Sequence, residues 1–164
     1  MSPRQLIRVM HVITDLKMGG AEMALANLLS GMDRAEFHSK VVALSDDQPV
    51  GAMIRNMGIE VTSLNARPGI PAPRMFMKLR KEILGFSPDI IQTWMYHSDL
   101  VGALSARLAG KIPVVWGIHH TVSERNALKS TTHFVAKLNA FLSRFLPFSL
   151  IVQIFYFLFL LLAL

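Results

Sequence analysis

Short runs rich in apolar and β-branched residues alternate with helix-length stretches over most of this 164-residue chain. This alternation limits the possible folds more than any other feature of the sequence. Runs of this composition favour strands, and they cover residues 6–13, 38–45, 59–64, 90–94 and 113–118. Strands that are connected through helices by short loops form a parallel sheet covered by helices on both faces. We therefore predict an α/β fold.

The intervening stretches carry helical periodicity and helix-boundary residues. Predicted helices cover residues 20–32, 50–57, 74–86, 98–108 and 132–145. Gly58 ends the second of them, and a proline-rich loop at 67–73 precedes the third. The turn at 46–49, and either Ser98 or Asp99, can cap the helices that follow. Helices and strands in this order predict a Rossmann-like sheet.

Ligands bind outside the carboxyl ends of the strands in open sheets of this kind. The loops at this edge are predicted at residues 14–22, 45–50, 65–73, 95–99 and 117–124. Two of these loops carry histidines and one carries paired glycines, so these three loops are the best candidates for a functional site.

The loop after the first strand contains Gly19 and Gly20, followed by Glu22. Paired glycines at a strand-to-helix turn allow a ligand to approach the backbone closely. The helix beyond them offers unpaired N–H groups to an anion, and Glu22 in its first turn suits the helix dipole. The loop lacks the Lys-Ser/Thr of a Walker loop and the third glycine of the dinucleotide fingerprint. A tight turn with a capping acid is the alternative interpretation.

His97 follows the fourth strand, and His119 and His120 follow the fifth. A histidine at this edge can bind sugar hydroxyls or transfer protons near neutral pH. We expect His97 to be catalytic, with a role in helix capping or at the core edge as the alternative. His119 and His120 point to different sides of an extended chain, so we expect no metal site.

The formal net charge is +6, and many of the basic residues crowd the third predicted helix and the loop before it. Aromatic residues suited to base stacking are scarce there, which argues against nucleic-acid binding. A solvated helix face and contact with anionic lipid remain as interpretations. The membrane-contact candidates are Arg74, Lys78, Arg80 and Lys81.

Three segments resemble the amino-terminal domain of family-four retaining glycosyltransferases, which have the GT-B fold of two Rossmann-like domains facing a cleft. The segments are Ile7 to Glu22 with its Gly-Gly-Ala-Glu, Pro88 to Gly102, and Ile112 to Thr121. The resemblance covers about residues 6–152 and implies that this chain is the acceptor-side half of such a fold.

The resemblance also implies residue roles. Gly19 and Gly20 would lie near the diphosphate and the transferred sugar of the donor, and Glu22 would line the same cleft. His97 would contact the sugar, and the loop at His119 and His120 would face the acceptor. The family often has a histidine where Gln92 stands here, which removes one polar contact.

The implied activity is transfer of a sugar from a nucleotide-sugar to a glycan or lipid-linked acceptor in cell-envelope or exopolysaccharide synthesis. No metal or other cofactor is expected. The family's donor-binding domain, with its Glu-x7-Glu motif, is absent from these 164 residues, so we expect the chain alone to be inactive. A non-catalytic membrane-associated binding module is the alternative, and a nucleotide-binding regulator or an epimerase is a weaker one.

The last residues depart from the family pattern. We divide the chain into a domain at 1–147 and an apolar tail at 148–164, in which a last family-like strand continues to about residue 152. The remainder has no charge and no glycine. It is interpreted as a frameshift product, a membrane anchor or a buried strand and helix. With no cysteine and no secretory-signal pattern, we expect a cytoplasmic protein. The resemblance implies a peripheral position on the inner membrane face, which the basic helix would suit.

Overall fold

The structure is a computed structural model that describes residues 6–67, 73–110, 112–117, 135, 137–139 and 149–152. His119 and His120, most of the predicted helix at 132–145, and the tail beyond residue 152 lie outside the described residues.

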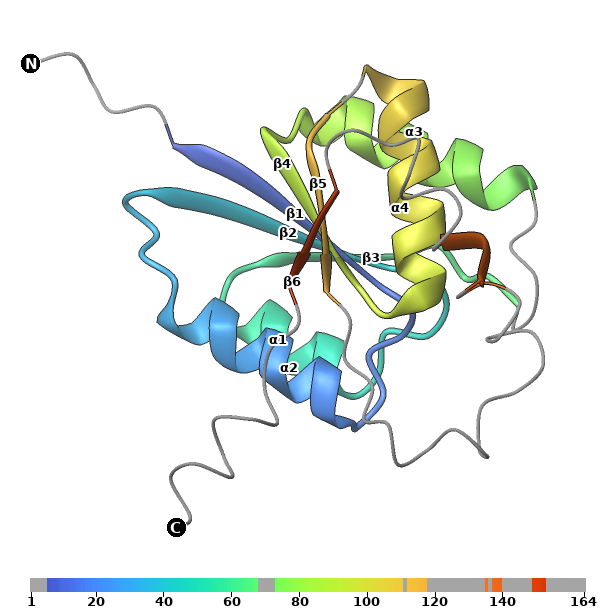
Figure 1. Ribbon diagram of the computed structural model, residues 1–164. Coiled ribbons are helices and arrows are strands. Elements are labelled where there is room, and N and C mark those ends of the chain that lie inside the picture. The colour runs from blue at the N-terminus through green and yellow to red at the C-terminus, as the bar shows by residue number, and fades with distance from the viewer. Residues whose placement is uncertain are drawn as a thin grey trace, which may run out of the picture.

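The described elements alternate along the chain as predicted (Figure 1). They are β1 Ile7–Ile13, α1 Gly20–Gly31, β2 Phe37–Ala43, α2 Val50–Asn56, β3 Glu60–Ser63, α3 Pro73–Phe86, β4 Ile90–Trp94, α4 Tyr96–Ala109, β5 Val114–Gly117 and β6 Ser149–Val152. The α/β prediction is confirmed. The strand β6 lies where the last family-like strand was expected.

The described strands form one six-stranded sheet in the order β3-β2-β1-β4-β5-β6, and all neighbours are parallel. The chain moves outward from β1 to β3 and then returns to the other side of β1 as β4. The register pairs Ile13 with both Ala43 and Trp94, so three strands end at the same level. Ligands of open α/β sheets bind where the strand order reverses, which here is between β1 and β4.

Helices cover both faces of the sheet: α1 and α2 lie on one face, α3 and α4 on the other (Figure 1). Alternate residues of β1 point to these two faces. Met10 and Val12 belong to a buried cluster with α3 and α4, whereas Ile13 belongs to a buried cluster with α1 and α2. This two-sided burial explains why β1 is apolar almost throughout.

The helix α2 begins at Val50 as predicted, but its cap and the beginning of α4 differ from the predictions. The N-cap of α2 is Pro49 and that of α4 is Met95, and neither helix has a side-chain cap. The structure places Ser98 and Asp99 inside the first turn of α4, so the prediction that one of them caps the helix is wrong. Both side chains are buried and bind residues of the sheet or its loops instead.

Candidate functional site

Three loops at the carboxyl edge of the sheet are joined by hydrogen bonds. The amide of Ser45 donates to the carbonyl of Thr14 at 3.0 Å, which ties the loop after β2 to the loop after β1. The hydroxyls of Thr14 and Ser98 share a hydrogen bond of 3.2 Å, which ties the loop after β1 to α4. The glycine loop and the segment that carries His97 are therefore held together at the point where the strand order reverses.

The two glycines of the loop have different steric surroundings. Gly19 is the N-cap of α1 in extended conformation, and a Cβ added there would lie 2.4 Å from the carboxylate Oε2 of Glu22. A Cβ added to Gly20 would meet no atom within 4 Å. Gly19 therefore makes room for a side chain of the same loop, whereas Gly20 leaves its backbone open to a ligand.

Glu22 folds back onto the start of its own helix. Its side chain is buried, and burial raises the pKa of its carboxyl group. A hydrogen bond from its own backbone N–H acts in the opposite direction, and repulsion by Asp15 raises the pKa further. Its carboxylate thus fills space at the amino terminus of α1, as expected for a capping acid.

The amino terminus of α4 lies at the same edge as that of α1. Its N-cap, Met95, has a positive φ of 73°, which is strained for a side chain of this size. Its first helical hydrogen bond runs from the amide of Asp99 to the carbonyl of Met95 at 3.0 Å. The side chain of Met95 makes no capping hydrogen bond to this helix.

His97 lies in this first turn and is half-buried. Burial lowers the pKa of its imidazole, so the ring is neutral near pH 7. A neutral imidazole offers one N–H donor and one acceptor. It can therefore bind a sugar hydroxyl as donor or acceptor without carrying charge.

Two residues near His97 were not recognised in the sequence as part of this site. Asn139 is buried and donates from Nδ2 to the carbonyl of Tyr96 at 2.8 Å, which connects a later helical segment to the start of α4. Asp99 is buried and binds the hydroxyl of Thr93 at 2.6 Å. Asn139 gives no sequence signal because its partner is distant in the chain, whereas Asp99 was noted only as a possible cap and as an acid at this edge.

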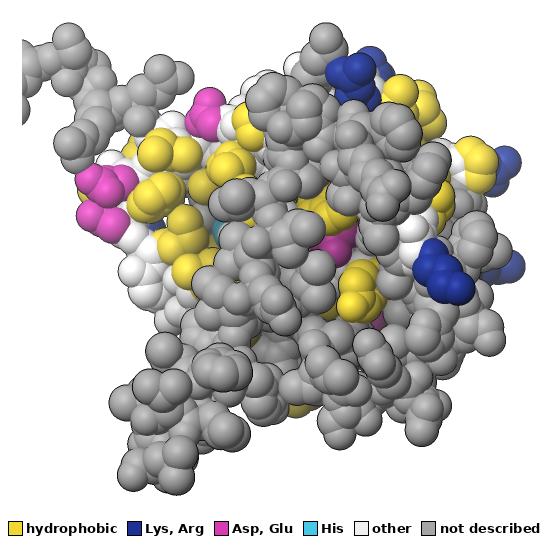
Figure 2. Space-filling view, viewed as in Figure 1, with side chains coloured by type: hydrophobic (Ala, Val, Ile, Leu, Met, Phe, Trp, Pro, Cys, Tyr) yellow, Lys and Arg dark blue, Asp and Glu magenta, His cyan; other side chains and the backbone are white. Residues whose placement is uncertain are grey.

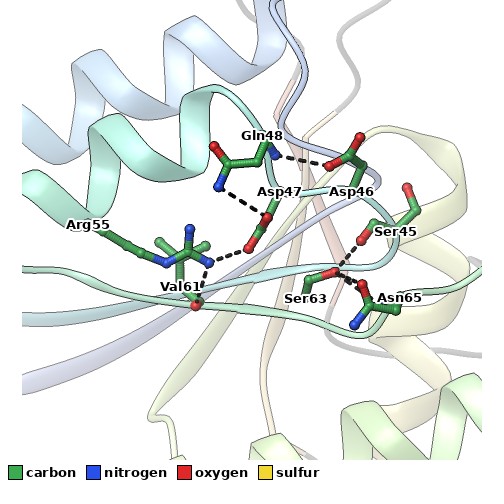
Figure 3. A network of polar contacts seen from close by, with 8 residues as sticks. All are labelled: Ser45, Asp46, Asp47, Gln48, Arg55, Val61, Ser63 and Asn65. Carbon is green, nitrogen blue, oxygen red and sulfur yellow. Dashed lines mark hydrogen bonds and ion pairs between the residues drawn. The ribbon is translucent and has the colours of Figure 1, made fainter.

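The loops after β2 and β3 form a separate polar network beside the glycine loop (Figure 3). Arg55 binds the carboxylate of Asp47 and the carbonyl of Val61, and Ser63 donates to the carbonyl of Ser45. These polar groups are engaged with one another. This part of the edge therefore serves mainly to fix the loops, and the open polar groups lie nearer β1 and β4.

The predicted membrane-contact residues of α3 fall into two kinds. Lys78 donates to the carbonyl of Leu64 at 2.9 Å, and Arg80 donates to that of Leu108 at 3.0 Å. Arg74 and Lys81 are exposed, and no described residue forms an ion pair with either. Lys and Arg side chains are visible along the margin that α3 and α4 occupy (Figure 2).

A cavity of about 330 Å³ lies at the opposite edge of the sheet, where β2 and β3 begin. Its lining includes Phe37, His38 and Glu60, far along the strands from the glycine loop. Within the described ranges, no three His, Asp or Glu side chains are grouped so that they could hold a metal ion. None of the helices in the described part of the chain has the length and apolar character to cross a membrane.

Comparison with known proteins identifies a sequence family and solved structures of similar fold. The sequence model of Glycosyltransferase Family 4 matches residues 18–152. The crystal structure of Anabaena HepE in complex with UDP and glucose has a TM-score of 0.64 at 16% identity, covering 92% of this chain and 45% of HepE. HepE in complex with UDP gives the same TM-score at 18% identity, covering 90% of this chain and 44% of HepE. The chain thus spans less than half of HepE, and no curated protein sequence matches it.

Proposed function

The chain belongs to Glycosyltransferase Family 4, and we propose that it forms the acceptor-side half of a GT-B enzyme that transfers a sugar from a nucleotide-sugar to a glycan or lipid-linked acceptor. The observation that carries this proposal is the convergence of the Gly19–Gly20 loop and the first turn of α4 at the reversal of strand order. Both segments lie within the family match.

The site has the chemistry that a nucleotide-sugar requires. The positive dipole end of α4 at its amino terminus and the open backbone at Gly20 suit the negative charge of a diphosphate. The neutral imidazole of His97 suits a sugar hydroxyl. The UDP and glucose bound by HepE support a ligand of this class. We propose that His97 acts at the transferred sugar and that the loop at His119 and His120 faces the acceptor.

We further propose that the remaining donor contacts are made by a second domain outside these 164 residues. Support comes from the share of HepE that the chain covers, which is 45%. The expected consequence is that this chain binds nucleotide-sugars weakly and does not transfer sugar by itself. Transfer to glycan or lipid-linked acceptors by the isolated chain would contradict this part of the proposal.

Backbone NMR of the labelled chain, titrated with a panel of UDP- and GDP-sugars, tests the proposed site. We expect at least one donor to shift the amide signals of Gly19, Gly20 and His97, and to leave that of Gly58 in place. Gly58 lies in the turn between α2 and β3, at the opposite edge of the sheet. If every donor left the signals of the glycine loop and of α4 unchanged, the proposed site would be wrong.

Replacement of His97 by alanine should weaken binding of the responding nucleotide-sugar about tenfold, because one hydrogen bond to the sugar is lost. Binding of the free nucleoside diphosphate should change little. His38→Ala is the matched control, since His38 is exposed at the amino edge of β2. Equal losses for the nucleotide-sugar and the free diphosphate would show that His97 does not contact the sugar.

A second candidate function, a non-catalytic membrane-associated module, is favoured by the outer surface of α3. Exposed Arg74 and Lys81 lie on the same side of the helix as Met77 and Leu84, which are 58% and 46% exposed. Cations beside apolar side chains suit an anionic lipid surface. We propose that this surface holds the protein on the inner membrane face. Lys78 and Arg80, which also bind backbone carbonyls, add positive charge to it.

Reversing both free charges, in Arg74→Glu with Lys81→Glu, should lower the partition coefficient onto anionic vesicles by at least about 30-fold at low salt, since each basic residue near such a surface contributes about 1 kcal/mol. Flotation of vesicles with and without phosphatidylserine measures this. Arg34→Glu with Lys137→Glu reverses two other exposed charges and should change partitioning much less. Equal loss in both double variants would indicate a general charge effect. A chain that ends at Val152 separates any contribution of the tail.

A further inference from the structure

Asp99 is a buried carboxyl group that the proposed function leaves without a role. It lies in the first turn of α4 and is 1% exposed. Its Oδ1 atom lies 2.6 Å from the hydroxyl of Thr93 in β4, and that hydroxyl lies 3.2 Å from the carbonyl of Val115 in β5. The other carboxyl oxygen, Oδ2, is buried and has no hydrogen-bond partner among the described residues.

The number of hydrogens decides which protonation state this arrangement suits. The hydroxyl of Thr93 has one hydrogen and two neighbouring acceptors, Asp99 and Val115. If Asp99 is ionised, Thr93 must donate to it, the bond to Val115 is lost, and a charged group stays buried with a single hydrogen bond. If Asp99 carries a proton, it donates to Thr93, and Thr93 donates to Val115.

We propose that Asp99 is a positioning residue: its protonated carboxyl group completes a chain of hydrogen bonds from Asp99 through Thr93 to Val115, which fixes the first turn of α4, and with it His97, on β4 and β5. The proposal rests on the proposed function in one respect, that the first turn of α4 faces the sugar. The chain of hydrogen bonds itself is independent of any ligand.

Close packing prevents Thr93 from turning away from this arrangement. Thr93 is fully buried, and a Cβ added to Gly102, one turn along α4, would lie 2.4 Å from its Cγ2 atom. The neighbouring Ser98 shares its hydrogen bond with Thr14 of the glycine loop. The first turn of α4 is thus attached to β4, to β5 and to the glycine loop at the same time.

Among the described residues, none compensates a charge on Asp99. Burial raises the pKa of Asp99 to about 7, and the hydrogen bond from Thr93 acts in the opposite direction. Neither β4 nor β5 contains a titratable residue, and His97 in the same turn is neutral because burial lowers its pKa.

In the part of the chain that the structure describes, charged residues of α3, α4 and β1 have other partners or are exposed. On α3, Lys78 and Arg80 bind backbone carbonyls and Glu82 binds Lys40, whereas Arg74 and Lys81 are exposed. On α4, Arg107 is exposed. In β1, burial lowers the pKa of His11 to about 4, so its imidazole is neutral as well.

The direction in which the stability of the fold changes with pH follows from the pKa of Asp99. Asp99 has a pKa of 3.8 in the unfolded chain and about 7 in the folded one. Its contribution to stability is therefore complete below about pH 4, falls as the pH rises from 4 to 7, and is absent above 7. Over this interval the unfolding equilibrium constant should rise about tenfold per pH unit from this group alone. His11 contributes the opposite slope between pH 4 and 6.5, because its pKa is lowered.

Asp99→Asn tests the proposal because an amide can donate to Thr93 as the protonated acid does. Since His11 and Glu22 titrate in overlapping ranges, the quantity to compare is the difference between the two proteins. Between pH 5 and 7, the unfolding equilibrium constant of the wild type should rise relative to that of Asp99→Asn by about tenfold per unit. The NMR signals of the His97 ring should show a step near pH 7 in the wild type that is missing in Asp99→Asn.

Identical pH dependence in the two proteins, or a His97 step that persists in Asp99→Asn, would overturn the proposal. A second pair of variants covers the case in which Asp99→Asn fails to fold. At pH 5, Thr93→Val should move the amide signals of Tyr96 and His97, and Thr93→Ser, which keeps the hydroxyl, should leave them in place. Equal effects of Thr93→Val and Thr93→Ser would also contradict it. None of these measurements uses a sugar, so a failed nucleotide-sugar titration and a failed test of Asp99 are distinguishable.

Discussion

Replacing Ile83 by alanine should lower the free energy of unfolding by about 2–5 kcal/mol, whereas the same change at the next residue, Leu84, should cost less than about 1 kcal/mol. Ile83 is fully buried in the cluster between α3, α4 and the sheet, and Leu84 is 46% exposed. Truncation of Ile83 removes buried methyl groups and leaves a cavity that the packed sheet cannot fill. Leu84 is nearly half exposed, so its truncation removes less buried surface and leaves no enclosed cavity.

Denaturant unfolding followed by circular dichroism and by the fluorescence of Trp94 and Trp116 measures both changes. Each variant serves as the control for the other, since the two residues are neighbours in one helix and both are aliphatic. Similar losses for Ile83→Ala and Leu84→Ala would mean that α3 does not face the sheet as described, or that its outer surface is covered by another part of the protein.

A glycine-to-alanine change should have opposite effects in α3 and α4. Gly102→Ala should destabilise the protein by about 1–3 kcal/mol, because its Cβ would lie 2.4 Å from Cγ2 of Thr93, a buried side chain held by Asp99. Gly85→Ala should stabilise it by about 0.5–1 kcal/mol, because Gly85 is exposed in a helix with no atom near its added Cβ.

The same unfolding experiment measures both variants. One variant should be less stable than the wild type and the other more stable, so an error in the extrapolated free energy of unfolding does not change the conclusion. A stabilising Gly102→Ala would show that α4 can move away from β4 at little cost. In that case the packing of Gly102 against Thr93 would not hold Thr93 and Asp99 in position.

The fold could be predicted largely because the strands are buried on both faces. β4 spans Ile90–Trp94, the range expected from its composition, and β1 differs from its expected range by one residue. The start of α4 could not be predicted in the same way. Ser98 and Asp99 have the composition of helix caps, yet tertiary contacts with Thr14 and Thr93 draw them inside the helix.

Other features depend on pairs of residues that no local pattern reveals. Lys40 lies within β2, where a charged residue argues against a buried strand. It is buried because Glu60 and Glu82 bind its ammonium group at 2.5 and 2.8 Å. The order of the strands also depends on contacts between distant parts of the chain. The sequence predicts five alternating strands and helices, but it does not determine on which side of β1 the fourth strand pairs.

The candidate site was only partly accessible to sequence reasoning. The glycine pair and His97 were recognised because their residue types are informative at the end of a strand. Their joint attachment through Thr14 and Ser98 required the structure, as did the different steric demands of Gly19 and Gly20. The expectations for His119, His120 and the tail stay predictions.

The strand order also determines how the sheet can grow as the chain is synthesised. β2 adds beside β1 and β3 beside β2, then β4 adds on the free side of β1, β5 beside β4 and β6 beside β5. Each of the six described strands can therefore add to an edge formed by strands that precede it in the chain, and none of these six has to enter between two that are already paired. Because the amino-terminal part of a chain leaves the ribosome first, the four strands within residues 7–94, which hold both sides of the proposed site, emerge before β5 and β6.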